Sequence, residues 1–337
     1  MVCRFQYAPY RRPLAVPLRT ARRVWYEREG IVIRLEATDG RIGYGEVAPV
    51  DGFGSETLEE AVDYLNSLSS TIEPEIFPGI PERLGCCRFA LASAWWQLEV
   101  PDVLYSFRNT ALLPTGESAV EALVQYLARG FLSFKMKIGV ASVREELADV
   151  QALLSLMPGE GRLRLDANGV LDEAGFRLWL DALDGHRGVE FIEQPMGAGA
   201  ERIMQSLAAG REMAVALDES LVSIDGIRAA LVQVRWTGPL VLKSSLLGFP
   251  ADVIAAVSGS QNSLVFSSVF ETGIGLHNGL RLASAAGAWM PVGYGTLSYF
   301  ADDLNLLPAA PHLDSTSVTP EGLEHLWQTI CAEFAKA

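Results

Sequence analysis

The chain has 337 residues and a formal net charge of −14, from 27 lysines and arginines against 41 aspartates and glutamates. This charge disfavours nucleic acid and anionic membrane surfaces as partners, and no local basic patch offsets it. Hydrophobic residues make up 49% of the chain, yet charged or turn-forming residues interrupt every 18-residue stretch, so we expect no membrane span. A barrel of about 250 residues with one added module fits this length.

The amino-terminal residues and the cysteines bear on location. Met1-Val2-Cys3-Arg4-Phe5 lacks the positive segment and apolar core that are typical of a signal peptide. The four cysteines have neither metal-finger nor C-x-x-C spacing, which favours free thiols. We therefore expect a cytoplasmic protein; its oligomeric state stays open.

The first hundred residues do not alternate strands with helices. Residues 30–35 and 42–47 flank an Asp-Gly turn, which predicts a β-hairpin. Two helical patterns follow, one opening at residues 57–60 and the other covering 88–98. This order is typical of an α+β capping domain, which we assign to residues 1–105.

From about residue 119 the chain alternates apolar, strand-like runs with helical patterns. The runs lie at 131–138, 163–165, 189–192, 214–217, 240–242 and 264–266. The helix after the first run is opened by a capping box, Ser142-x-x-Glu145. Near-constant spacing of the units favours a closed barrel over residues 106–304, although periodicity alone leaves an open doubly wound sheet as the alternative.

The last segment, residues 305–337, ends in an amphipathic helix predicted over 321–335. Its apolar face comprises Leu323, Leu326, Ile330 and Phe334. We expect this helix to return to the capping domain and complete it, so that two packed modules meet at a cleft.

Ionisable residues stand at the ends of five consecutive predicted strands. Their motifs are Lys135-x-Lys137, Asp166-x-Asn168, Glu193-Gln194-Pro195, Asp218-Glu219-Ser220 and Lys243-Ser244. The intervals from Lys137 through the three acidic positions to Lys243 are 29, 27, 25 and 25 residues, one βα unit each. Because TIM-barrel enzymes bind substrates where the strands end, the sequence predicts an active site at this face.

Three of these residues form a predicted metal site. Asp166, Glu193 and Asp218 end neighbouring strands about 4.8 Å apart, so their carboxylates can converge on one cation. Oxygen-only ligation favours Mg²⁺, with Mn²⁺ as the alternative, over zinc. Glu219 points to the other strand face, which makes Asp218 the better ligand.

The lysines flank this site and indicate proton transfer at carbon. Lys137 precedes the carboxylates by one strand and Lys243 follows them by one, which places an amine on each side of a metal-bound substrate. Burial and a nearby cation lower the pKa of such an amine, so that it can remove a proton next to a substrate carboxylate. Lys135 shares the inward face with Lys137, where it lowers that pKa further or binds the small-molecule carboxylate substrate.

This series of motifs resembles the muconate-lactonizing branch of the enolase superfamily over residues 130 to 295. Gly43-Tyr44-Gly45-Glu46 resembles the capping domain of that branch. The resemblance implies a modified TIM barrel, (β/α)7β, and two cap loops that close over the substrate. These loops match Leu18-Arg19-Thr20 and Gly52-Phe53-Gly54-Ser55.

Within that branch the chain is most similar to the o-succinylbenzoate synthases. The resemblance implies syn-dehydration of 2-succinyl-6-hydroxy-2,4-cyclohexadiene-1-carboxylate to 2-succinylbenzoate, on the route to menaquinone or phylloquinone. Lys137 would remove the ring proton and then protonate the departing hydroxide, while Lys243 would act electrostatically. Arg164 would lie near the substrate carboxylate, with a salt bridge inside the barrel as the alternative, and Ser267 and Ser268 near the succinyl tail.

Other interpretations stay open. An N-acylamino acid racemase or dipeptide epimerase shares the same acidic residues and lysines, although dipeptide epimerases usually carry Asp-x-Asp where this chain has residues 292–296. A catalytically silent barrel is a third hypothesis. The sequence of residues 273–279 predicts the start of a helix that binds a phosphate. His277, within this segment, is assigned no role.

Overall fold

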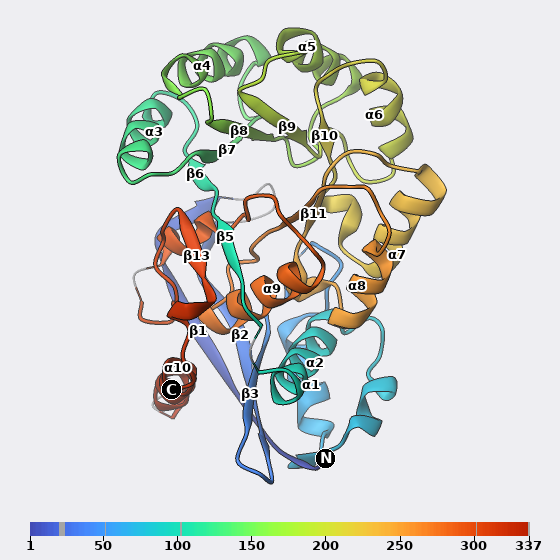
Figure 1. Ribbon diagram of the computed structural model, residues 1–337, viewed down its shortest axis with the longest axis vertical. Coiled ribbons are helices and arrows are strands. Elements are labelled where there is room, and N and C mark those ends of the chain that lie inside the picture. Colours follow the sequence, from blue (N-terminus) through green and yellow to red (C-terminus); the bar gives the residue numbers. More distant parts are fainter. Residues whose placement is uncertain (20–23, 51, 102, 301, 336–337) are drawn as a thin grey trace.

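The computed structural model describes residues 1–19, 24–50, 52–101, 103–300 and 302–335. Figure 1 shows two parts, a strand-rich part at the bottom and a helix-ringed part at the top. Among the described residues, no helix is both long enough and apolar enough to cross a membrane.

An antiparallel sheet with two helices forms most of the bottom part. Its order is β3-β2-β1-β4. The elements are β1 (Cys3–Arg19), β2 (Val24–Ala37), β3 (Ile42–Val47), α1 (Leu58–Ser67), β4 (Thr71–Ile72) and α2 (Gly85–Glu99). The predicted hairpin and both predicted helices are confirmed. At Gly45 any Cβ would overlap the Ala90 carbonyl oxygen, so glycine is required where α2 packs against β3.

Strand β1 was not predicted, because three prolines interrupt its sequence. A proline cannot donate to a sheet and is tolerated on an edge. β4 pairs only with Cys3 and Arg4 of β1, and an isolated antiparallel bridge joins Leu14 to Phe300, so most of the strand is an edge on that side. Pro9, Pro13 and Pro17 all lie in this uncovered part.

Parallel strand segments close the barrel in the upper part. The strands are β6 (Ala111–Leu113), β7 (Ser133–Lys137), β8 (Arg162–Asp166), β9 (Val189–Glu193), β10 (Val215–Ala216), β11 (Leu240–Leu242) and β12 (Leu264–Phe266). The helices between and after them are α3 (Ser118–Ala128), α4 (Val143–Leu156), α5 (Glu173–Leu183), α6 (Glu201–Ala208), α7 (Ile224–Arg228), α8 (Pro250–Val257) and α9 (Gly273–Ala285).

Three parallel bridges complete the ring. They join Leu217 to Leu240, Ser267 to Gly293, and Val292 to Asn109. Residues 292–293 thus take the place of an eighth strand. Counted over the described residues, the arrangement is (β/α)7β, which confirms the predicted fold class.

The carboxyl-terminal segment returns to the capping sheet. β13 (His312–Asp314) pairs with β5 (Ser106–Arg108), and α10 (Pro320–Phe334) packs against β1. Leu323, Leu326 and Ile330 are buried there, but Trp327 completes the apolar face instead of Phe334. The prediction for Phe334 was wrong: its side chain is 56% exposed, because the last helical turn ends the packed face at Ile330. The domain boundaries at residues 105 and 304 stay predictions.

Candidate active site

The ionisable residues predicted at the strand ends lie on adjacent strands. We define the strand-end cluster as Lys135, Lys137, Asp166, Glu193, Asp218, Glu219 and Lys243. Lys137 is in register with Asp166, and Asp166 with Glu193. Inward-facing residues two positions earlier along the strands form an apolar layer, comprising Phe191, Ala216, Val241 and Val265 with Met290. Because side chains alternate along a strand, this layer supports the cluster from below.

Lys135 lies between two of the predicted metal ligands. Its Nζ is 2.7 Å from Asp166 Oδ2 and 2.7 Å from Glu193 Oε1. Lys243 Nζ is likewise paired with Asp218 Oδ1. Within the described ranges, no three Asp, Glu, His or Cys side chains converge closely enough to hold one ion. The ammonium groups of Lys135 and Lys243 therefore supply the positive charge next to these carboxylates.

The charge balance of the strand-end cluster fits a cation. It holds four carboxylates against three lysines, and Glu219 Oε2 is buried without a hydrogen-bond partner among the described residues. Burial, and after it the Asp166 carboxylate, raises the pKa of Glu193. Burial and the Asp218 carboxylate raise the pKa of Glu219 to about 7. Although burial acts in the opposite direction, the Lys135 ammonium lowers the pKa of Asp166. One ammonium cannot compensate two carboxylates, and a divalent ion would supply the missing charge.

The lysines differ in their surroundings. Against the effect of burial, carboxylates raise the pKa of Lys135 and of Lys243. The reason is that each faces carboxylates directly. Lys137 makes no hydrogen bond or ion pair with any described residue and is partly exposed. Among the described residues, Lys137 is therefore the lysine of the strand-end cluster whose ammonium group has no protein partner.

A cap loop reaches this face of the barrel, as the sequence predicted. The Phe53 ring centroid lies 4.9 Å from Lys243 Nζ, within range of a cation–π contact. Leu18, in the other predicted loop, is partly exposed at the end of β1, and Thr20 lies outside the described residues. The sequence identified Phe53 only as part of a cap loop. Its contact with Lys243 was not predicted, because a contact between distant segments leaves no local pattern.

Two polar side chains support the cluster and were not singled out in the sequence. Gln194, fully buried, accepts hydrogen bonds from the backbone N–H groups of Asp218 at 2.9 Å and Ser220 at 3.3 Å. Asn168 donates through Nδ2 to Glu219 Oε1 at 3.2 Å. Both have positive φ, 37° and 45°, a conformation that bends the chain sharply after the strand. Their positions inside the Glu-Gln-Pro and Asp-x-Asn motifs could have identified these two residues from the sequence.

Arg164 occupies the layer below the cluster. Its Nε is 2.6 Å from Glu190 Oε2, its guanidinium lies 5.1 Å from the Phe191 ring centroid, and the residue is 1% exposed. The geometry matches the barrel salt bridge that the sequence left as the alternative, because Arg164 stands two residues deeper than Asp166.

The two predicted serines lie directly after β12. Ser267 Oγ is 3.4 Å from the Gly293 carbonyl oxygen, and its residue is partly exposed. Ser268 Oγ donates to Glu271 Oε2 at 2.6 Å and accepts from Thr296 Oγ1 at 2.7 Å. Ser268 is therefore held inside a protein network, whereas Ser267 faces more open space.

The start of α9 corrects one prediction. Its first backbone amides bind the Glu46 carboxylate, through Thr272 N at 3.0 Å and Gly275 N at 2.9 Å, so a phosphate is excluded there. The Glu46 carboxylate accepts hydrogen bonds from the free N–H groups of the helix and lies at the positive end of its dipole. His277 is packed, with Nδ1 2.8 Å from the Tyr105 hydroxyl, and burial lowers its pKa to about 3.

Two family models match the chain. Residues 5–75 match the MenC N-terminal domain, and residues 118–235 match the enolase C-terminal domain-like family. The o-succinylbenzoate synthase of Thermosynechococcus vestitus is 39% identical over 276 residues, which cover 80% of this chain and 85% of that protein.

Solved structures agree with these matches. The o-succinylbenzoate synthase of Thermosynechococcus elongatus BP-1, complexed with magnesium in the active site, superposes with a TM-score of 0.85. It is 35% identical, and the match covers 97% of this chain and 99% of that one. A dipeptide epimerase from Methylococcus capsulatus, with magnesium and a dipeptide, shares the fold at a TM-score of 0.76 and 24% identity, with 89% and 92% covered.

Proposed function

Since the chain belongs to the o-succinylbenzoate synthase family of the enolase superfamily, a family of hydro-lyases, we propose that it dehydrates 2-succinyl-6-hydroxy-2,4-cyclohexadiene-1-carboxylate to 2-succinylbenzoate. The observation that carries this proposal is the pair of unequal lysines across the strand-end cluster. Lys137 is unpaired among the described residues, whereas Lys243 is bound to Asp218. This asymmetry fits a dehydration in which one base both removes and returns the proton.

Lys137 is the proposed acid and base. Its neutral amine removes the proton from the ring carbon that bears the carboxylate, and the ammonium then returns that proton to the departing hydroxide. The C–H and C–O bonds break, one water leaves, and the ring becomes aromatic. Lys243 stays charged through its contact with Asp218 and stabilises the negative charge that develops in the substrate.

We assign the metal to Asp166, Glu193 and Asp218, with Glu219 beside them. Magnesium, or manganese as the alternative, would draw electron density from the substrate carboxylate and stabilise the charge formed at the ring carbon. The excess of carboxylates in the strand-end cluster and the unpaired Glu219 Oε2 support this assignment.

Lys135 and Ser267 are the proposed substrate contacts. Lys135 lies among the strand-end carboxylates, where its ammonium can bind a substrate carboxylate. Ser267 is the better hydrogen-bond partner for the succinyl arm, because Ser268 already has protein partners. We assign Arg164 no substrate contact, since Glu190 binds its Nε and Thr110 its Nη1 in the layer below the strand ends, although its buried Nη2 has no partner among the described residues.

One assay tests the reaction. The purified protein with Mg²⁺ is given the cyclohexadiene substrate, and the absorbance of the diene is followed. Loss of the diene with formation of 2-succinylbenzoate is expected, and no change over hours would contradict the proposal.

The same preparation separates the racemase or dipeptide epimerase alternative. It is incubated with an N-acylamino acid and with a dipeptide in deuterated water, and α-hydrogen exchange is measured. Exchange without dehydration of the diene would favour the alternative. Against that outcome, residues 292–296 lack the Asp-x-Asp pattern, and the structural match to the dipeptide epimerase is only 24% identical. A place in menaquinone or phylloquinone formation, and the cytoplasmic location, stay predictions.

A further inference from the structure

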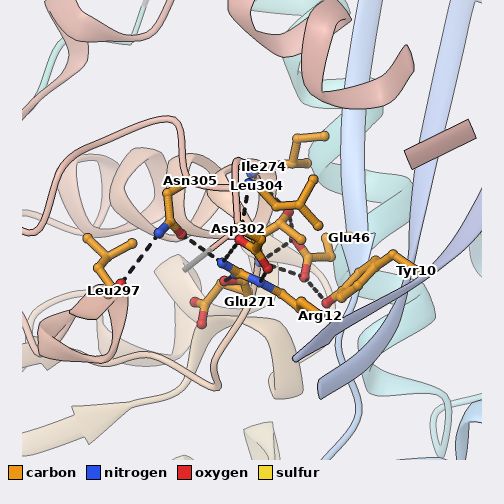
Figure 2. A network of polar contacts seen from close by, with 10 residues as sticks. Tyr10, Arg12, Glu46, Glu271, Ile274, Leu297, Asp302, Leu304 and Asn305 are labelled. Atoms are coloured by element: carbon orange, nitrogen blue, oxygen red, sulfur yellow. Dashed lines mark hydrogen bonds and ion pairs between the residues drawn. The ribbon is translucent and has the colours of Figure 1, made fainter. Parts of the chain in front are cut away.

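Three buried side chains of the capping sheet bind the backbone of one barrel segment, residues 269–275. Arg28 Nε donates to the Val269 carbonyl at 3.1 Å, and Arg12 Nη1 donates to the Glu271 carbonyl at 2.7 Å. The Glu46 carboxylate accepts from the amides at the start of α9. Figure 2 shows Arg12 and Glu46 reaching toward Glu271 and Ile274 from the cap strands. The capping sheet therefore holds this segment by its main chain.

The held segment contains a strained residue. Phe270 has a φ of +66°, which a bulky residue adopts only at a cost of about 1–3 kcal/mol when the surroundings enforce it. Phe270 lies between the two carbonyls that Arg28 and Arg12 bind. Its ring packs against Trp25 with centroids 5.9 Å apart. The contacts with the capping sheet enforce the turn.

This turn sets the position of the serines after β12. Phe270 N donates to Ser268 Oγ at 2.8 Å, and Val269 N donates to Glu271 Oε2 at 2.7 Å. The Ser268 hydroxyl donates to the same carboxylate oxygen. If the turn relaxed, Ser268 would lose these partners, and the adjoining Ser267 would move with it.

Arg28 also holds the cap loop. Its Nη1 donates to the Pro49 carbonyl at 2.7 Å, just before the loop whose Phe53 ring lies over Lys243. Arg28 is 5% exposed, so water cannot readily replace a lost bond. One guanidinium thus joins the base of the cap loop to the strained turn of the barrel.

We propose that Arg28 is a positioning residue for the reaction: its guanidinium couples the cap loop that carries Phe53 to the turn at residues 268–271, and so fixes the site of the succinyl arm. This inference rests on the proposed function. A lysine would reach only one of the two carbonyls, because its ammonium is a single point charge and not a planar fork.

The matched control is Arg34, a buried arginine on the same strand whose partners, Gln6, Glu36 and Glu324, all lie in β1, β2 and α10. Arg28→Met should raise KM for the cyclohexadiene substrate about tenfold, the loss expected for one or two buried hydrogen bonds, with kcat within about threefold of wild type. Arg28→Lys should raise KM by roughly threefold, and Arg34→Met should leave KM within about twofold. An unchanged KM in both Arg28 variants, or the same rise in Arg34→Met, would overturn the proposal.

A second measurement does not depend on turnover. Hydrogen exchange of amides 268–272 should be about tenfold faster in Arg28→Met than in wild type, and near wild type in Arg34→Met. If Arg28→Met does not fold, Arg28→Lys decides the matter through the same two measurements, and wild-type values in both would refute the coupling. A wild-type enzyme that leaves the diene intact would reject the proposed function, while the exchange result would still support or overturn the coupling.

Discussion

Two buried groups of charged residues in this protein are built differently. In the strand-end cluster, carboxylates outnumber lysines and one carboxylate oxygen lacks a partner among the described residues. The cap–barrel network is defined as Tyr10, Arg12, Glu46, Glu271, Asp302 and Asn305. Its carboxylates also outnumber its cations, and Glu271 Oε1 likewise lacks a partner among the described residues. The other contacts come from groups fixed by the fold: Arg12 bonds Asp302, Asn305 and the Glu271 carbonyl, and Glu46 accepts from the Tyr10 hydroxyl and from backbone amides. The two groups differ in what meets their carboxylates. Lysine ammonium groups meet those of the strand-end cluster, where a metal ion and a substrate would also bind, whereas hydroxyl and backbone N–H donors meet Glu46 and Glu271. Substitutions in the two groups should therefore have different effects.

The largest effect is expected at Lys137. Lys137→Ala removes the proposed acid and base, so kcat should fall by at least about a thousandfold, or about 4 kcal/mol. The midpoint of urea unfolding should stay near wild type, because no described residue loses a hydrogen bond or ion pair. Steady-state kinetics and urea titration check both. Retained turnover would remove Lys137 from the mechanism.

Glu271, in the cap–barrel network, should make stability depend on pH. Burial raises its pKa to about 7 from an ordinary 4.5, so the folded state holds a proton that the unfolded state loses between pH 4.5 and 7. Its contribution to stability is present below pH 4.5 and is lost as pH rises through 7, a difference of about 3 kcal/mol. The free energy of unfolding of wild type minus that of Glu271→Gln should fall by this amount over the window. A flat difference would contradict the assignment.

Glu46→Gln should lower the free energy of unfolding more than it lowers the rate of the reaction. The variant keeps the shape but loses the charge that the amides of α9 and the Tyr10 hydroxyl bind, which costs about 2 kcal/mol of unfolding free energy. Glu59→Gln, on an exposed position of α1, is the control and should cost under about 0.5 kcal/mol. Equal unfolding free energies for the two variants would show that the network is not structurally important.

The smallest effect is expected at Gln194, which supports the strand-end cluster without belonging to it. Gln194→Leu should weaken Mg²⁺ binding about tenfold, because Asp218 loses the hydrogen bond that orients its backbone. Calorimetric titration of Mg²⁺ into the variant and the wild type measures this. Wild-type affinity would show that the strand end alone positions Asp218.

The sequence by itself determined the elements that local rules describe. The strands and helices of the barrel followed from alternation and caps, such as the box at Ser142 and Glu145, which the structure contains. The strand-end motifs at one-unit intervals predicted which residues would share a face, because parallel strands in register bring equivalent positions together.

Only the tertiary structure decided what depends on distant contacts. Arg164 pairs with Glu190, Glu46 takes the start of α9, and Phe53 lies over Lys243, none of which a local pattern encodes. Strand β1 was not predicted, because a strand with three prolines is possible only at an edge. That edge exists because β4 pairs with just two residues of β1, which the sequence does not reveal. The partner of a buried charged side chain depends on how the whole chain packs. The strand-end residues could therefore be predicted from the sequence, whereas the cap–barrel network could not.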